Sequence, residues 1–122
     1  MAPYERFAAW QHSHRLVLSV YQATQKWPRH EMFGLVSQAR RAAVSVPSNL
    51  AEGSAKRGSR EFSRYLDIAN GSLSELEYLL RLARDLGYLE RNRWETIEAQ
   101  RDVAGRSLWG LYAAIRRRTP RA

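Results

Sequence analysis

A row of polar side chains is the feature of this sequence best suited to chemistry or specific contact. Its members are spaced by three or four residues, so they share one side of a helix. They are Gln38, Arg41, Ser45, Asn49 and Glu52. A neighbouring row of small apolar residues predicts close packing against another helix. Pro47 removes one helical hydrogen bond between these rows, which predicts a kink.

The polar row has matching residues in the next helical segment. If the chain turns back near residues 56–59, the two helices are antiparallel, and the residue numbers of two facing positions add up to a nearly constant value. This pairs Arg41 with Glu75, Glu52 with Arg64, and Ser45 with Ser72. The structural interpretation is a partly buried network that fixes helix register, because buried polar groups need partners. The functional interpretation is a ligand or subunit contact. The predicted network comprises Arg41, Ser45, Asn49, Glu52, Ser72 and Glu75.

The net charge points to an acidic partner. The formal charge is +8, from 20 lysines and arginines against 12 acidic residues. Such a balance favours nucleic acid or an acidic protein as partner, although solvated basic faces are common. The candidate nucleic-acid contacts are Arg40, Lys56, Arg57, Arg60, Arg64, Arg116, Arg117 and Arg118. These stretches lack interleaved aromatic residues, so we expect structured RNA to be read by shape and phosphate spacing.

Enzymatic and metal chemistry find little support in the residue pattern. His12 and His14 lie two apart, on different faces of a helix, and His30 lies in a link. The sequence has no phosphate-binding loop, no Glu-x-x-His pair and no cysteine. We therefore expect no metal, no cofactor and no catalysis. The absence of cysteine fits a reducing cytoplasm, and no apolar run is long enough to span a membrane.

Hydrophobic spacing predicts four helical segments, at about residues 4–27, 32–52, 59–86 and 92–115. The third carries a heptad seam between residues 62 and 83, which is typical of nearly parallel helix packing. Short links then favour an all-α, antiparallel up-down-up-down four-helix bundle. It would form one domain over residues 1–122, with a basic, frayed tail at 116–122. A three-helix bundle with a loose first helix is the alternative, and Trp10, Tyr21 and Trp27 argue against it.

Particular residues predict where these helices end and touch. Gly53 and Gly87 fit the left-handed position that closes a helix. Asn92, with Glu95 three residues later, is expected to cap the fourth helix. Gly71 interrupts the third helix, so we expect another helix to approach closely there.

Two motifs resemble a known family. They are RRAxxSVPSNLAEG at residues 40–53 and EFxRYLxIAxGSLxELE at residues 61–77. They are similar to the four-helix-bundle family of 23S rRNA intervening-sequence proteins, to which the accessory proteins of diversity-generating retroelements are related. The resemblance extends over about residues 7–111. It implies an up-down-up-down bundle that assembles into a homopentameric ring, and for the accessory branch a basic surface that binds a reverse transcriptase and its RNA.

The expected function follows from the charge and the resemblance together. We expect a non-catalytic oligomeric scaffold that associates with RNA or a ribonucleoprotein through a basic surface. The alternative is a ring-shaped protein-interaction adaptor with no nucleic-acid role. Four tryptophans and six tyrosines are a large aromatic content for 122 residues, which predicts burial between chains.

Overall fold

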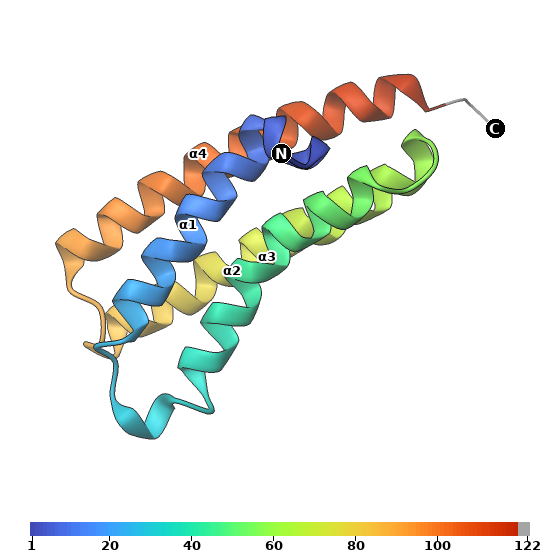
Figure 1. Ribbon diagram of the computed structural model, residues 1–122. Coiled ribbons are helices and arrows are strands. Elements are labelled where there is room, and N and C mark those ends of the chain that lie inside the picture. Colours follow the sequence, from blue (N-terminus) through green and yellow to red (C-terminus); the bar gives the residue numbers. More distant parts are fainter. Residues whose placement is uncertain (120–122) are drawn as a thin grey trace.

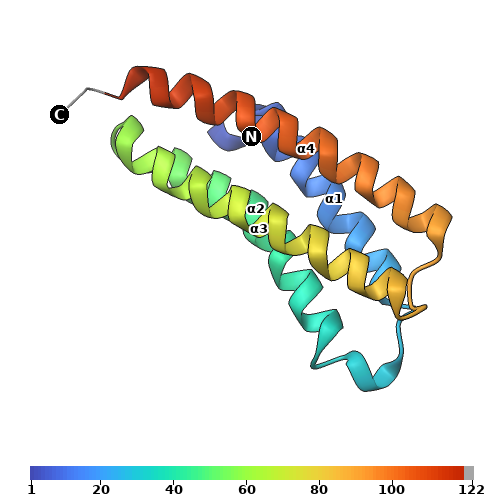
Figure 2. The ribbon, with the colours of Figure 1, turned by 180° about the vertical axis from the view of Figure 1, so that it is seen from behind.

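The computed structural model describes residues 1–119 as four antiparallel α-helices (Figure 1). The helices are α1 (Ala8–Thr24), α2 (Leu35–Ser54), α3 (Ser59–Asp85) and α4 (Arg91–Arg118), with short 3-10 turns η1 (Pro3–Arg6) and η2 (Arg29–Glu31). Helices α1 and α3 each pack against both α2 and α4, and successive helices reverse direction (Figures 1 and 2). The all-α, up-down-up-down bundle expected from the sequence is therefore confirmed.

The core follows the heptad seam of α3. Leu66, Leu73, Leu76 and Leu80 are almost completely buried along this helix. The other helices contribute Leu16, Leu50, Ile97 and Leu108, none of which is exposed. Each buried leucine or isoleucine stabilises the fold by about 1.5–3 kcal/mol through the removal of apolar surface from water. Because α1 supplies core residues and Trp27 is buried at its end, the three-helix alternative is wrong.

Only one of the two glycines expected to close a helix does so. Gly87 has φ 82°, and the N–H of Tyr88 donates to the carbonyl of Ala83 at 2.9 Å, which completes a left-handed cap after α3. Gly53 instead lies inside α2, which continues to Ser54. The left-handed residue of this turn is Gly58, with φ 81°, directly before α3.

Gly53 lies where two helices approach closely, a contact that the sequence predicted at Gly71. A Cβ atom added at Gly53 would lie 2.6 Å from the Cβ of Tyr65 and 3.0 Å from a ring carbon of Phe62. The same atom added at Gly71 would meet nothing within 4 Å. The close approach between helices is therefore at Gly53, where α2 crosses α3. Gly71 faces outward and is exposed.

Two further boundaries differ from expectation. Helix α4 begins at Arg91 with Glu90 as its N-cap, and Asn92 lies within the first turn. The side-chain oxygen of Asn92 accepts only from the N–H of the next residue, at 2.8 Å. Leu89, in the short link before α4, is buried. At its other end α4 remains helical through Arg118, and residues 120–122 of the predicted tail lie outside the described residues.

Helix α2 passes through Pro47 without ending. The proline is buried inside the helix, and α2 changes direction near its middle (Figures 1 and 2). A proline lacks the N–H that would bond four residues back, so a bend is the expected consequence.

One polar cluster joins the two links at the end of the bundle opposite the α2–α3 turn. One oxygen of Glu31 accepts from the N–H of Leu35 at 3.1 Å, and the other accepts from the hydroxyl of Tyr88 at 3.0 Å. The N–H bond, then the tyrosine bond, and also the neighbouring His30 lower the pKa of Glu31, against a smaller opposing effect of burial. The bond to Glu31 raises the pKa of Tyr88. The cluster fixes both links together.

A second cluster joins α3 to α4. Arg101 donates to both oxygens of Glu98, at 2.7 and 3.2 Å, and to Glu77 of α3 at 3.0 Å. Burial disfavours the charge on Arg101, but the bond to Glu98 and the surrounding acids outweigh it and raise its pKa. This arginine interrupts the apolar seam of α4 because its head is paired at the helix interface.

Candidate nucleic-acid interface

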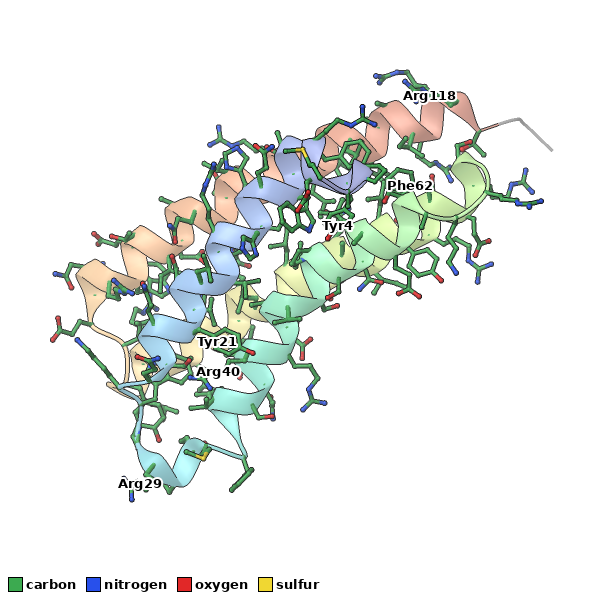
Figure 3. The ribbon with its side chains drawn as sticks, in the orientation of Figure 1. Tyr4, Tyr21, Arg29, Arg40, Phe62 and Arg118 are labelled. Carbon is green, nitrogen blue, oxygen red and sulfur yellow. The ribbon has the colours of Figure 1, made fainter. Side chains whose placement is uncertain are left out.

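Two basic segments that are distant in the sequence meet at one end of the bundle. Residues 56–60 form the α2–α3 turn and the start of α3, and residues 116–118 form the last turn of α4. The hydroxyl of Thr119 donates to that of Ser59 at 3.1 Å, which joins the two segments. Figure 3 shows Arg118 at the same end as Phe62 of α3. We call this surface the basic end; it comprises Lys56, Arg57, Arg60, Arg64, Arg116, Arg117 and Arg118.

Local structure explains why these cations are held in place. The C-terminal end of a helix carries partial negative charge, which favours Arg116, Arg117 and Arg118 in the last turn of α4. Gly58 allows the sharp turn that presents Lys56 and Arg57 to solvent. These charges therefore lie on the α2–α3 turn and on the last helical turn of α4.

Two cations of the basic end lie beside aromatic rings. The ion pairs of Arg84, Arg91, Arg101 and Arg106, all within residues 1–119, lie elsewhere on the bundle. Lys56 instead lies over the ring of Tyr65, with Nζ 5.5 Å from its centroid. Arg116 lies 6.0 Å from the ring centroid of Tyr112. Positive charge gathered on one surface is the electrostatic signature of a phosphate-binding or acid-binding site.

A groove of about 520 Å³ lies between the two basic segments. Its apolar lining comes from Phe7, Phe62, Leu111 and Ile115, and Lys56 and Arg118 lie at its sides. The site thus combines an apolar floor with cationic edges.

Arg40 does not belong to this surface, although the sequence grouped it there. Its Nε donates to the hydroxyl of Thr24 at 2.9 Å, and its guanidinium lies 4.5 Å from the ring centroid of Tyr21. Figure 3 shows Arg40 beside Tyr21, far along the bundle from Arg118. The side chain is half-buried and ties α2 to α1.

The uncharged part of the predicted polar network is present. The hydroxyls of Ser45 and Ser72 lie 2.7 Å apart and join α2 to α3. The amide of Asn49 donates to the carbonyl of Ser45 at 2.7 Å and to its hydroxyl at 3.0 Å. These contacts fix the register of the helix pair at the expected level.

The charged pairs of that network do not form as buried ion pairs. Arg41 and Glu75 line the same hollow between α2 and α3, but both are exposed and no ion pair joins them in the described chain. Glu52 and Arg64 are likewise exposed and unpaired with each other. The sum of two residue numbers gives the level along two helices but not the direction of each side chain. These four charges therefore contribute little to stability.

The sequence reading missed two aromatic residues next to the basic end. Trp109 and Tyr112 of α4 stack with ring centroids 5.2 Å apart and planes 7° from parallel. Arg116 continues the same helix face, since the spacings are three and four. This spacing is the signal that the sequence offers for the pair, on a face of α4 beside its apolar seam.

The part of the chain that the structure describes offers neither a metal site nor a membrane-spanning helix. Within residues 1–119, no three histidine, cysteine or acidic side chains lie close enough together to hold a metal ion. None of the four helices is both long and apolar enough to cross a membrane.

Fold and surface together define an all-α bundle protein with a cationic end. Residues 5–110 match the family model of the 23S rRNA-intervening sequence protein. The match covers most of the chain, so the chain belongs to this family, as its motifs indicated. No curated protein matches it.

Proposed function

We propose that this chain is a non-catalytic, cytoplasmic scaffold that assembles as a homopentamer and binds structured RNA or a ribonucleoprotein through the basic end. The observation that carries the proposal is the convergence of residues 56–60 with residues 116–118 into one cationic surface. Membership of a family named for an rRNA intervening sequence supports RNA as the acidic partner. A reverse transcriptase with its RNA is one such ribonucleoprotein, since the RNA phosphates carry the negative charge that a cationic surface would bind.

Assembly would strengthen this binding. A closed ring repeats each basic end, so the few cations of one chain become a continuous band. Large apolar side chains are exposed on the single chain and support burial between copies: Leu18, Phe33, Ile68 and Leu86. Light scattering should give a mass five times the 14.1 kDa of one chain. A stable monomer at micromolar concentration would contradict the ring.

The test of the function is a filter-binding titration with an RNA stem-loop across a salt series. Each phosphate contact contributes about −0.9 to the slope of log affinity against log salt on a duplex. Replacing Lys56, Arg57 and Arg60 together with glutamate should abolish binding while the helical content is kept, because all three side chains are exposed.

A matched control separates a site from a general charge effect. Lys26, Arg29 and Arg93 are exposed at the opposite end, and their replacement with glutamate changes the net charge equally. Figure 3 shows Arg29 at the far tip from Arg118. This variant should retain binding. Failure of the unmodified protein to bind at low salt, or equal loss in both variants, would exclude the basic end as an RNA site.

A protein-docking adaptor is the second candidate, and the apolar groove favours it. An acidic amphipathic segment could place apolar side chains against Phe62 and Ile115 and carboxylates against Lys56 and Arg118. RNA that fails to compete with such a protein partner would favour the adaptor.

A further inference from the structure

Three side chains on one face of α4 form a layered column. The rings of Trp109 and Tyr112 are stacked, with centroids 5.2 Å apart, and the guanidinium of Arg116 lies 6.0 Å from the Tyr112 centroid. We call Trp109, Tyr112 and Arg116 the aromatic column. It begins on open surface and ends in the basic end.

The two ends of the column differ in exposure. Tyr112 is half-buried and packs against the core, so it holds the column in place. Trp109 is 61% exposed, although a tryptophan indole is among the largest apolar surfaces that a side chain can bury. One face of the indole lies against Tyr112, and the large exposed fraction of the side chain leaves surface for a further flat group.

The surroundings favour a flat group that carries negative charge. Arg116 lies at one end of the column, and Arg117 and Arg118 follow it directly. Every nucleobase has a π face, and stacking on an aromatic side chain tolerates any base. A single-stranded nucleotide chain combines such faces with regularly spaced phosphates.

We propose that the aromatic column binds an unpaired stretch of RNA, with a base stacked on Trp109 and the following phosphates at Arg116 and the basic end. This rests on the RNA-binding function proposed above and adds the class of RNA that the same surface takes. It also replaces the expectation, drawn from the basic stretches alone, that base stacking plays no part.

The dimensions of the column suit a short single strand. Trp109 and Arg116 are seven residues apart, which is about 10 Å along a helix that rises about 1.5 Å per residue. Stacked nucleotides advance about 3.4 Å each along one strand. The nucleotides that follow the base on Trp109 would pass beside Tyr112 to reach the guanidinium, and a span of about 10 Å is only a few nucleotides long.

The experiment compares two RNA probes on three protein variants. The probes are a fluorophore-labelled oligouridine, which has little structure, and a blunt-ended RNA duplex of equal length. The variants are Trp109→Ala, Trp109→Leu, which keeps an apolar side chain without a π face, and Tyr78→Ala. Tyr78 is the matched control, because it is 60% exposed on α3 and, among the described residues, has no ring or cation partner.

Fluorescence anisotropy at low salt should separate the probes. Both Trp109 variants should bind oligouridine about 5- to 150-fold more weakly, the range expected for one lost base stack. Their salt slope should be unchanged, since phosphate contacts remain. Duplex binding, and both probes on Tyr78→Ala, should match the unmodified protein. Oligouridine should also quench the intrinsic tryptophan fluorescence of the unmodified protein, and the Trp109 variants should lose most of that quenching.

Other outcomes overturn the inference in distinguishable ways. If both Trp109 variants keep the oligouridine affinity of the unmodified protein while charge reversal still abolishes stem-loop binding, base stacking on the aromatic column is refuted. The proposed RNA-binding function then still stands. A smaller assembly of the Trp109 variants in sedimentation velocity shows that a second protein copy covers the indole, which also refutes base stacking on the column. If the unmodified protein binds neither probe at low salt, the proposed function fails and the column's RNA role fails with it.

Discussion

Alanine at Gly53 and at Gly71 should change stability in opposite directions. Both glycines lie inside helices, where alanine is favoured by about 1 kcal/mol because it restricts the unfolded chain and shields the backbone. At Gly71 the new Cβ meets nothing within 4 Å, so the full gain of about 1 kcal/mol is expected. At Gly53 the new atom would lie 2.6 Å from the Cβ of Tyr65.

The overlap at Gly53 should outweigh the gain in helix propensity. Carbon atoms pack at about 3.5–4.0 Å, and the obstructing atom is at the root of the Tyr65 side chain, where no rotamer change removes it. Overpacking a core costs about 1–3 kcal/mol, and this short distance places Gly53→Ala near the upper limit. A net loss of about 2 kcal/mol follows, so the two variants should differ by about 3 kcal/mol.

The measurement is urea unfolding followed by far-ultraviolet circular dichroism, at one protein concentration for all samples because the proposed assembly would contribute to stability. A Gly53→Ala variant at least as stable as the unmodified protein would refute the close contact between α2 and α3. Destabilisation by Gly71→Ala would refute the open surroundings of that position.

Two further predictions concern the polar clusters. Arg101→Ala should lower the free energy of unfolding by about 2 kcal/mol, because it leaves the Glu98 carboxylate unpaired while that side chain is only 18% exposed. Glu77→Ala should lower it by less than about 1 kcal/mol, because the Glu77 side chain is 48% exposed. The urea midpoints of both variants test this difference. Tyr88→Phe should destabilise at neutral pH by removing the bond to Glu31. Because folding lowers the pKa of Glu31 from its ordinary 4.5, that carboxylate's contribution is present above this value and is lost as pH falls through the folded pKa. The difference between Tyr88→Phe and the unmodified protein should therefore narrow in acid, and a difference independent of pH would contradict the cluster.

The sequence by itself determined the helices and their order. Apolar residues at heptad spacing in α3 can be buried only on one continuous stripe, so the bundle follows from periodicity. Gly87 could be recognised as a cap because few other residues adopt a positive φ at low cost. The level of Ser45 against Ser72 also followed from sequence, since helix rise is constant and a short turn fixes where counting starts.

The tertiary structure alone decided which side chains meet. Helical spacing gives the level and the face of a residue, but the angle at which two helices pack decides whether a pair such as Arg41 and Glu75 closes or remains in solvent. For the same reason the backbone contact lies at Gly53 rather than at Gly71. The basic end required the last turn of α4 to lie over the α2–α3 turn, more than fifty residues away in the chain. No local sequence pattern encodes the proximity of these two segments, because it arises from the packing of all four helices around one core.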